Sequence, residues 1–378
     1  MNGLSNQRQV AVCHLAAGNL YGGIETLLVV MARRRASCPG LEPSFTVCFE
    51  GRLAEELRAA GVPVHVLGAV RASRPWTILR ARRALLRVLR STRFDVVVSH
   101  GSWTHAFFAP VARKAGTGLV AWIHNPPDGR HWLDRWARTS PPDLAIANSR
   151  FTQAAVPALF PDVPSEVICY PVESAAWGGR AAVRPKTRGE LTTTEAEVVI
   201  LMAARMEAWK GHRILIEALG RLHGEPGWTC WIAGGAQRRA EEEYLGDLEA
   251  RIAARKLASR VRMLGQRSDV PRLMASADVY CQPNAEPEPF GIVFIEALHA
   301  GLPVVASDSG GAAEIVDAGC GVLVPAGDAT ALAQALRNLV RNPGLRRKLG
   351  AAGPARALAL CDPAARLQEF REALQRHR

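Results

Sequence analysis

The chain has 378 residues and carries 47 basic against 35 acidic side chains, a formal net charge of +12. With 48% apolar and 22% charged residues the composition is that of a globular protein, which excludes intrinsic disorder, and no apolar run approaches the roughly 18 residues of a membrane-spanning helix. This length predicts two domains, and the basic excess favours anionic partners: phosphate-bearing ligands, an anionic membrane surface or nucleic acid.

Apolar, strand-length runs alternate with helical segments along the whole chain. The first series is Val10–Leu15, Phe45–Phe49, Val62–Leu67, Asp95–Ser99, Leu119–Ile123, Leu144–Ala147 and Glu166–Cys169. The second series is Val198–Ala203, Trp228–Ala233, Val261–Leu264, Val279–Cys281, Val304–Ala306 and Val322–Val324. Near-continuous apolar strands separated by helices indicate parallel sheets covered on both faces. The sequence therefore predicts an α/β protein with two Rossmann-like, parallel-sheet domains.

The first strand runs into a loop with a glycine pair, Gly22-Gly23, before a helix. Glycines at a strand-to-helix turn let backbone N–H groups reach an anion, although this is not the dinucleotide fingerprint G-x-G-x-x-G. Similar glycine pairs follow two later strands, at Gly234-Gly235 and Gly310-Gly311. One such loop alone reads equally as an ordinary turn, whereas several at strand ends favour a phosphate-bearing ligand.

The segment from Arg71 to Arg93 contains eight arginines and no acidic residue. Its helical wheel gathers the apolar residues on one arc and places the stripe Arg80, Arg83, Arg87 and Arg90 opposite. One interpretation is a solvated outer helix. The other is a patch for an anionic lipid surface or an anionic acceptor.

Several histidines stand near strand ends of the first half: His14, His100, His105, His124 and His131. His124 directly follows an apolar strand, so we expect it to face an interdomain cleft, where it would contact a sugar hydroxyl or phosphate, or move a proton. The alternative is a histidine satisfied by the backbone. The scatter of the histidines does not indicate a metal site.

The first strand series ends near Pro171, and residues 175–194 lack a clear apolar period, so the linker is expected there. We expect domains at 1–175 and 176–362. Residues 363–378 should form a helix that packs at the domain junction through Leu367, Phe370 and Leu374.

Two cations, Arg205 and Lys210, follow the first strand of the second series, five positions apart on a loop. Arginine grips phosphate oxygens bidentately and lysine adds a point charge, so the pair would stabilise a departing diphosphate. Alone, this loop would be read as two solvated cations. Its position at the end of a parallel strand, as for the loop described next, favours function.

The stretch from Glu288 to Glu296 carries most information. Pro287 and Pro289 forbid helix there, Gly291 allows close backbone approach, and helical spacing begins near Gly291. Glu288 is therefore expected on a loop at a strand's carboxyl end and Glu296 on the helix that follows, where open α/β sheets bind ligands. Two carboxylates placed so would accept hydrogen bonds from sugar hydroxyls at two points of one elongated ligand.

The cysteines predict neither disulfides nor zinc. The eight are scattered singly, without a C-x-x-C pair, at positions 13, 38, 48, 169, 230, 281, 320 and 361. Those in strand runs are best read as small buried hydrophobes, and the first ten residues lack the apolar core of a signal peptide. We therefore expect a reducing cytoplasm and no metal site.

In this order, the set resembles the retaining glycosyltransferases of family 4, group 1, with the GT-B fold. The E-x7-E element matches Glu288 to Glu296 with Phe290-Gly291 inside it. Further matches are Arg205 with Lys210-Gly211, Gly265-Gln266 with Asp269-Val270, Ser309-Gly310-Gly311 with Glu314, and Gly22-Gly23-Ile-Glu25. The chain departs from the family at Ala204, where a glycine is usual, and at Tyr170-Pro171, where Asn-Gly is usual.

The resemblance implies two domains facing a central cleft, with a C-terminal helix that crosses back. It also implies roles. Glu296 would bind the nucleotide ribose; Glu288 and the backbone of Phe290, Gly291 and Ile292 would hold the donor sugar. Arg205 and Lys210 would bind the leaving diphosphate without a metal or another cofactor. Gly22 and Gly23 would offer amides to phosphate, and His124 would contact sugar or acceptor.

The expected function is transfer of a hexose, with retention, from a nucleotide-diphosphate sugar to a glycan, lipid-linked or small-molecule acceptor. The enzyme would be cytoplasmic and peripheral on the inner face of the membrane through its arginine stripe. Two alternatives remain: a non-catalytic nucleotide-sugar-binding scaffold, and a Rossmann oxidoreductase, against which the missing G-x-G-x-x-G speaks. Nucleic acid is not expected, since no binding motif accompanies the charge and aromatic residues make up only 6%.

Overall fold

The computed structural model describes residues 9–19, 22–174, 179–236 and 238–377. The chain divides into two compact units, Met1–Glu173 with Cys361–Arg378, and Ser174–Leu360. The expected division was at residues 175/176, with the C-terminal helix beginning at 363.

The first unit is a seven-stranded parallel sheet with the order β3-β2-β1-β4-β5-β6-β7. Its strands are β1 (Val10–Ala16), β2 (Leu41–Val47), β3 (Val64–Val66), β4 (Val96–His100), β5 (Gly118–Ile123), β6 (Leu144–Ala147) and β7 (Ser165–Val167). Its helices are α1 (Gly23–Arg34), η1 (Arg35–Ser37), α2 (Arg52–Ala59), α3 (Pro75–Ser91), α4 (Ser102–Ala115), α5 (Trp132–Ala137), α6 (Arg150–Leu159) and α15 (Pro363–Arg376).

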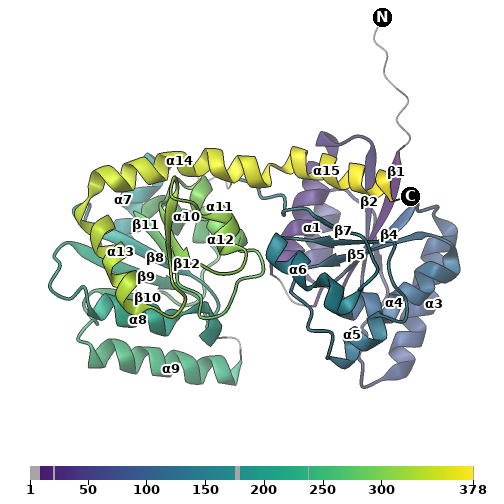
Figure 1. Cartoon of the computed structure of the whole chain (residues 1–378), viewed down its shortest axis with the longest axis horizontal. Coiled ribbons are helices and arrows are strands. Elements are labelled where there is room, and N and C mark those ends of the chain that lie inside the picture. The colour runs from purple at the N-terminus through teal and green to yellow at the C-terminus, as the bar shows by residue number, and fades with distance from the viewer. Residues whose placement is uncertain (1–8, 20–21, 175–178, 237, 378) are drawn as a thin grey trace, which may run out of the picture. The chain divides into compact units, whose positions relative to one another are not determined.

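The second unit is a six-stranded parallel sheet with the order β10-β9-β8-β11-β12-β13. Its strands are β8 (Val198–Ala203), β9 (Trp228–Ala233), β10 (Val261–Met263), β11 (Val279–Gln282), β12 (Val304–Ser307) and β13 (Gly321–Val324). Its helices are α7 (Arg180–Glu190), η2 (Ala208–Lys210), α8 (His212–Gly220), α9 (Arg239–Ala254), α10 (Val270–Ser276), α11 (Ile292–His299), α12 (Ala312–Ile315), α13 (Ala329–Arg341) and α14 (Pro343–Cys361), which ends in the first unit (Figure 1).

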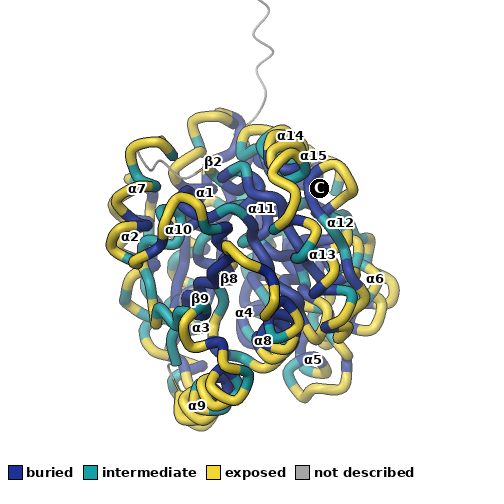
Figure 2. Tube along the Cα trace, turned by 90° about the vertical axis from the view of Figure 1, so that its left-hand side faces the viewer, coloured by how far each residue is buried: buried dark blue, intermediate teal, exposed yellow. Residues whose placement is uncertain are grey.

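Strand residues are apolar on both faces because helices cover both sides of each sheet. In β1, Cys13 and Leu15 pack into the core beneath α3 and α4, whereas Ala16 faces the core beneath α1 and α2. Figure 2 shows β8 and β9 buried, while the outer turns of α9 are exposed. The prediction of two Rossmann-like parallel sheets is confirmed, and all thirteen predicted strands are present with ends shifted by at most four residues.

One sequence prediction was wrong: the expected linker at 175–194 contains helix α7. Residues 175–178 lie outside the described part of the chain. The sequence of α7 lacks the apolar stripe from which a helix is predicted. Arg184 and the buried Arg188 instead converge on Asp278, at 3.0 and 2.5 Å, and donate to the carbonyl oxygen of Ser276. Charge-assisted hydrogen bonds, which hydrophobic periodicity cannot reveal, hold this helix to the end of α10 and to the residue before β11.

The C-terminal helix α15 returns to the first unit, as expected of a helix that crosses back. Its apolar stripe of Leu367, Phe370 and Leu374 is buried, and the helix packs against α1 and η1 (Figure 1). The Phe370 ring packs, tilted, against His14 and Trp122, and its centroid lies 5.8 and 5.1 Å from theirs. The helix is therefore part of this unit's core. Among the described residues, no helix is long and apolar enough to cross a membrane.

Three histidines form a hydrogen-bonded chain inside the first unit. The rings of His14 and His100 are joined at 3.0 Å, those of His100 and His124 at 3.0 Å, and His124 Nδ1 meets the Tyr170 hydroxyl at 2.5 Å. Burial lowers the pKa of His14 and of His124 to about 3, and it lowers the pKa of His100 well below its usual value. The histidine chain therefore consists of neutral imidazoles. His100 and His124 each donate through one ring nitrogen and accept through the other, whereas His14 bonds through Nδ1 and its buried Nε2 has no hydrogen-bond partner among the described residues.

The three buried histidines predict that the fold loses stability in acid. Above about pH 6.5 the three histidines are neutral in both the folded and unfolded chain and leave the free energy of unfolding unchanged. Below it, the unfolded chain binds protons that the folded chain cannot, until the folded pKa near 3 is reached. Each histidine should then lower the free energy of unfolding by about 1.4 kcal/mol per pH unit. Equilibrium urea unfolding at pH 7.5, 6 and 5 measures this slope.

A His14→Gln variant should show a smaller slope than the wild type between pH 6 and 5. The exposed His223 supplies the control, since His223→Gln should leave the slope unchanged. Equal slopes for the wild type and His14→Gln would contradict the assignment of the acid sensitivity to the chain.

Candidate functional site

The second sheet reverses its strand order between β8 and β11, which are neighbours in space. At such a reversal the loops leave the carboxyl ends of adjacent strands in opposite directions and open a crevice where α/β proteins bind ligands. The loop after β8 carries Arg205 and Lys210, and the loop after β11 carries Glu288. The topology thus brings the predicted cations and the predicted carboxylate to one place.

Lys210 and Glu288 form an ion pair with 2.7 Å between Nζ and Oε2. Their side chains are only 13% and 12% exposed, so water screens the pair weakly. Burial lowers the pKa of Lys210, and the Glu288 carboxylate works against this shift. The face of the Trp209 ring lies 3.7 Å from the same ammonium.

Glu288 is also held by side chains of β11 and of the loop that follows it. Glu288 Oε2 accepts from the Asn284 side chain at 2.9 Å and from the Gln282 side chain at 3.4 Å. Gln282 donates to Asn284 at 2.8 Å and accepts from the Tyr280 hydroxyl at 2.8 Å. This row was not predicted from the sequence, although its signal was present: Tyr280, Gln282 and Asn284 alternate along β11 and the residues just after it, and alternate positions of an extended segment share one face.

Glycines bring the loops around Glu288 into contact. A Cβ at Gly211, whose φ is +84°, would lie 1.8 Å from the carbonyl oxygen of Pro283. A Cβ at Gly310 would lie 2.4 Å from the Glu288 carbonyl oxygen, which also accepts from the Gly311 amide at 2.7 Å. Three loops, after β8, β11 and β12, therefore close on Glu288 only because these positions lack side chains.

Arg205 lies at the same strand end but is more open, with 57% of its side chain exposed. Its Nη1 is 2.9 Å from Glu207 Oε1, and Glu207 Oε2 accepts from the indole N–H of Trp209 at 2.9 Å. Neither Glu207 nor Trp209 was predicted to belong to the site.

The E-x7-E element spans the turn into α11. Phe290 is buried, Gly291 takes the left-handed conformation with φ +102°, and the helix begins at Ile292 as expected. Glu296 lies within α11, and burial raises its pKa to about 7. The structure records no ion pair or hydrogen bond of the Glu296 carboxylate among the described residues, so it is available to a ligand's hydroxyl groups.

In the first unit, Gly22 and Gly23 are exposed where α1 begins. The Gly22 amide donates to the Glu25 carboxylate at 2.9 Å, so a side chain of the same loop already takes one of the expected anion-binding amides. His124 is buried, and both of its ring nitrogens bond, to His100 and Tyr170. The roles predicted for these residues stay predictions.

The arginine stripe on α3 lies as its wheel predicts. Arg80, Arg83, Arg87 and Arg90 are all exposed, while Ile78, Ala81, Leu85 and Leu89 are buried beneath them. Within the described ranges, none of the four arginines forms an ion pair. Trp76 and Leu79, 64% and 53% exposed, lie on the first turns of the same helix.

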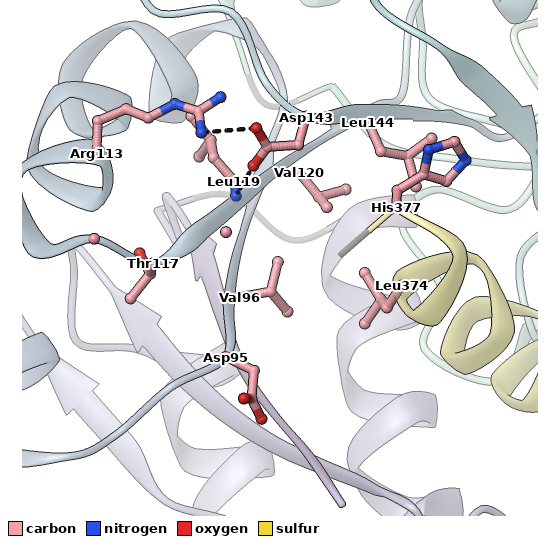
Figure 3. A pocket seen from close by; sticks show the side chains of 12 residues that line it. Asp95, Val96, Arg113, Thr117, Leu119, Val120, Asp143, Leu144, Leu374 and His377 are labelled. Atoms are coloured by element: carbon pink, nitrogen blue, oxygen red, sulfur yellow. Dashed lines mark hydrogen bonds and ion pairs between the residues drawn. The ribbon is translucent and has the colours of Figure 1, made fainter. Parts of the chain in front are cut away.

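A cavity of about 490 Å³ lies elsewhere in the first unit, between the amino ends of β4 to β6 and the C-terminal helix (Figure 3). Its charged lining is paired: Arg113 donates to Asp143 at 2.7 Å, and Asp143 accepts from the Leu119 amide at 2.7 Å. No predicted site residue lines it. In the part of the chain that the structure describes, there is also no cluster of three His, Cys, Asp or Glu suited to a metal ion.

Two family models match the chain. Residues 21–175 match the model described as Glycosyltransferase Family 4, and residues 183–356 match Glycosyl transferases group 1.

Curated relatives match over part of their length. The phosphatidyl-myo-inositol mannosyltransferase of Mycobacterium leprae is 42% identical over 161 residues, which are 42% of this chain and 41% of the relative. Human alpha-1,3/1,6-mannosyltransferase ALG2 is 26% identical over 260 residues, 65% of this chain and 60% of the relative. The chain thus spans about two fifths of the length of the mycobacterial relative it matches.

Solved structures extend the likeness over the whole fold. Anabaena HepE, crystallised in complex with UDP and glucose, aligns with a TM-score of 0.83 at 24% identity and covers 97% of this chain and 100% of that one. Sucrose-phosphate synthase from Thermosynechococcus elongatus aligns with a TM-score of 0.75 at 18% identity, covering 98% and 100%. At these identities the likeness concerns the fold. Taken with the two family models, it shows that the chain belongs to the group 1 glycosyltransferases of family 4, with the GT-B fold.

Proposed function

We propose that the protein is a hexosyltransferase that moves a sugar, with retention, from a nucleotide-diphosphate sugar to a glycan, lipid-linked or small-molecule acceptor. The observation that carries the proposal is the buried Lys210–Glu288 pair with Arg205 beside it at the strand reversal of the second sheet. In this proposal the cations bind the diphosphate, and the carboxylate accepts hydrogen bonds from the sugar hydroxyls.

The main electrostatic task in such a transfer is to stabilise the charge that develops on the leaving diphosphate. Donors fixed before the reaction supply this stabilisation without reorganisation at the moment of bond cleavage. Lys210 is fixed by Glu288 and by the Trp209 ring, and Arg205 is held by Glu207. With two cations in place, a metal ion or another cofactor is not required.

Glu296 would accept hydrogen bonds from the nucleotide ribose. It lies eight residues after Glu288 on α11, and its partly buried carboxylate gains hydrogen bonds only when hydroxyl groups arrive. The backbone of Phe290, Gly291 and Ile292 between the two carboxylates would contact the donor sugar. In the first unit, Gly22, Gly23 and His124 would contribute to phosphate, sugar or acceptor.

The relatives favour glycolipid acceptors, since the mycobacterial enzyme acts on phosphatidyl-myo-inositol by its name, and the Anabaena structure favours a uridine nucleotide. We infer a cytoplasmic enzyme that is peripheral on the inner face of the membrane through the α3 stripe.

A non-catalytic scaffold would not need a preorganised leaving-group site. An oxidoreductase would need the missing G-x-G-x-x-G. Nucleotide release from a panel of nucleotide sugars tests the proposal, and no release from any sugar would refute it.

Lys210→Ala and Arg205→Ala should each slow sugar transfer by about a hundred- to a thousandfold, because each removes one preorganised donor to the leaving diphosphate. Steady-state rates with the active nucleotide sugar measure this. Arg213→Ala is the control, since that exposed arginine pairs with Asp247 on the surface and should transfer sugar normally. Thermal unfolding checks that the variants fold. Turnover near wild type for both cation variants would refute the leaving-group role.

Glu296→Ala should weaken binding of the free nucleoside diphosphate, whereas Glu288→Ala should mainly reduce turnover and affinity for the intact sugar nucleotide. The reason is their separation along one ligand. Isothermal calorimetry with the diphosphate separates the two roles. A larger loss of affinity in Glu288→Ala than in Glu296→Ala would reverse them.

Because the pKa of Glu296 is raised, the pH dependence of diphosphate binding tests the role assigned to this residue. The carboxylate is ionised above about pH 7 and accepts hydrogen bonds best in that form. Affinity for the diphosphate should therefore fall as pH drops from 8 to 6. The Glu296→Gln variant should lack this part of the fall, while titration of the phosphate affects both proteins alike.

Activity should survive chelation, because Arg205 and Lys210 already supply positive charge at the diphosphate. Transfer rates in the presence and absence of EDTA check this. A rate that collapses in EDTA and returns with magnesium or manganese would mean that the phosphate site is misread.

The α3 stripe should bind anionic vesicles reversibly, since each arginine near such a surface contributes about 1 kcal/mol and added salt screens the attraction. Cosedimentation with phosphatidylglycerol vesicles, against neutral phosphatidylcholine vesicles, measures it. Replacing Arg80, Arg83, Arg87 and Arg90 by glutamine should abolish cosedimentation and leave donor hydrolysis intact.

A matched control removes two exposed cations of the second unit, Arg347→Gln with Lys348→Gln, and should cosediment like the wild type. A wild type that ignores anionic vesicles at low salt would make the stripe a solvated helix face and point to a soluble acceptor.

A further inference from the structure

Trp209 contacts three groups around the loop after β8, although the proposed function assigns it no contact with the ligand itself. It lies in η2, between Arg205 and Lys210. Its carbonyl oxygen accepts from the Ala285 amide at 2.8 Å, which ties the loop after β8 to the loop that carries Glu288. The indole ring and its N–H group then contact two different charged groups.

The ring face acts on Lys210. The ammonium lies 3.7 Å from the ring centroid and 2.7 Å from Glu288 Oε2. A lysine held by a carboxylate alone can rotate its four-carbon stem about that single contact. A second contact on the ring face, worth more when water is excluded, leaves the ammonium one position.

The indole N–H acts on Arg205 through a carboxylate. It donates to Glu207 Oε2 at 2.9 Å, and Glu207 Oε1 lies 2.9 Å from Arg205 Nη1. An arginine that is 57% exposed would otherwise sample many rotamers, which costs binding entropy when phosphate orders it. Glu207 engages one guanidinium nitrogen, so the remaining N–H groups stay free for phosphate oxygens.

We propose that Trp209 is a positioning residue that sets the places of both phosphate-binding cations, Lys210 directly through its ring face and Arg205 indirectly through Glu207. This rests on the proposed function, because it takes the diphosphate of the donor as the ligand of Arg205 and Lys210. The ligand class it concerns is a nucleoside diphosphate, whose second phosphate needs both cations at once.

Two substitutions separate the two contacts. Trp209→Phe keeps an aromatic face for Lys210 but removes the N–H group that holds Glu207, and Trp209→Leu removes both. Glu207→Ala removes the clamp on Arg205 and leaves the ring. UDP and GDP, with UMP and GMP as their monophosphates, serve as probes in calorimetry, and transfer rates give kcat and KM.

We expect Trp209→Phe to bind the diphosphate about tenfold more weakly than the wild type, the loss of one charge-assisted contact, with the monophosphate affected less. Because both changes break the same link, Trp209→Phe combined with Glu207→Ala should be no weaker than Glu207→Ala alone. Trp209→Leu should in addition lower kcat about tenfold below that of Trp209→Phe. A residue needed only for folding would instead weaken diphosphate and monophosphate alike and lower the midpoint of thermal unfolding.

Three results would overturn the inference. Additive losses in the double variant would mean that Trp209 does not act through Glu207. Tighter diphosphate binding by Glu207→Ala would show that Glu207 competes with phosphate rather than orienting Arg205. If Trp209→Leu kept wild-type affinity and kcat while Lys210→Ala was inactive, the positioning role of Trp209 would be refuted and the proposed function would stand. If Lys210→Ala and Arg205→Ala also bind the diphosphates like the wild type, the proposed function itself fails.

Discussion

The buried ion pair between Lys210 and Glu288 is the interaction on which the arrangement of the second unit's site depends. Taking two charges out of water costs several kcal/mol per ion, and only close geometry with further hydrogen bonds offsets it. The structure supplies both: a 2.7 Å contact, and amide donors from Asn284 and Gln282 on the same carboxylate oxygen. Either charge left alone would be strongly unfavourable, so the loops that carry them are fixed relative to one another. Glycines at 211, 310 and 311 make this possible, because side chains there would collide with the backbone around Glu288.

This pair also shapes how a diphosphate would bind. In the structure Lys210 is neutralised by Glu288, and Arg205 by Glu207. An incoming phosphate therefore shares or exchanges partners with carboxylates rather than meeting free cations. The gain is a site whose donors are already oriented, which is the condition for stabilising charge in a transition state.

The first unit also buries polar side chains at the strand reversal of its sheet, but these side chains are uncharged. At its own strand reversal, between β1 and β4, it places His14 and His100, joined to each other and then to His124 and Tyr170. Neutral imidazoles bond to one another in the interior, where ionised groups would be costly, although the buried Nε2 of His14 has no hydrogen-bond partner among the described residues. Tyr170 stands where the family usually has asparagine, and its hydroxyl closes the chain. Since both ring nitrogens of His124 are engaged, contact with a ligand through its ring requires one of these bonds to be exchanged.

The sequence by itself determined the strands, the two parallel sheets and the family, because apolar runs between helices and the E-x7-E element are local patterns that need no knowledge of distant contacts. It also determined that Arg205, Lys210 and Glu288 follow strands. Only the tertiary structure decided that β8 and β11 are neighbours, since strand order depends on packing across the whole sheet, and this places Lys210 on Glu288. The same holds for α7, which Asp278 fixes from ninety residues away, and for Trp209, whose contacts with Lys210 and Glu207 depend on how its loop folds back. Side-chain contacts between segments far apart leave no period in the sequence, which is why the pattern gave the elements and the fold gave the site.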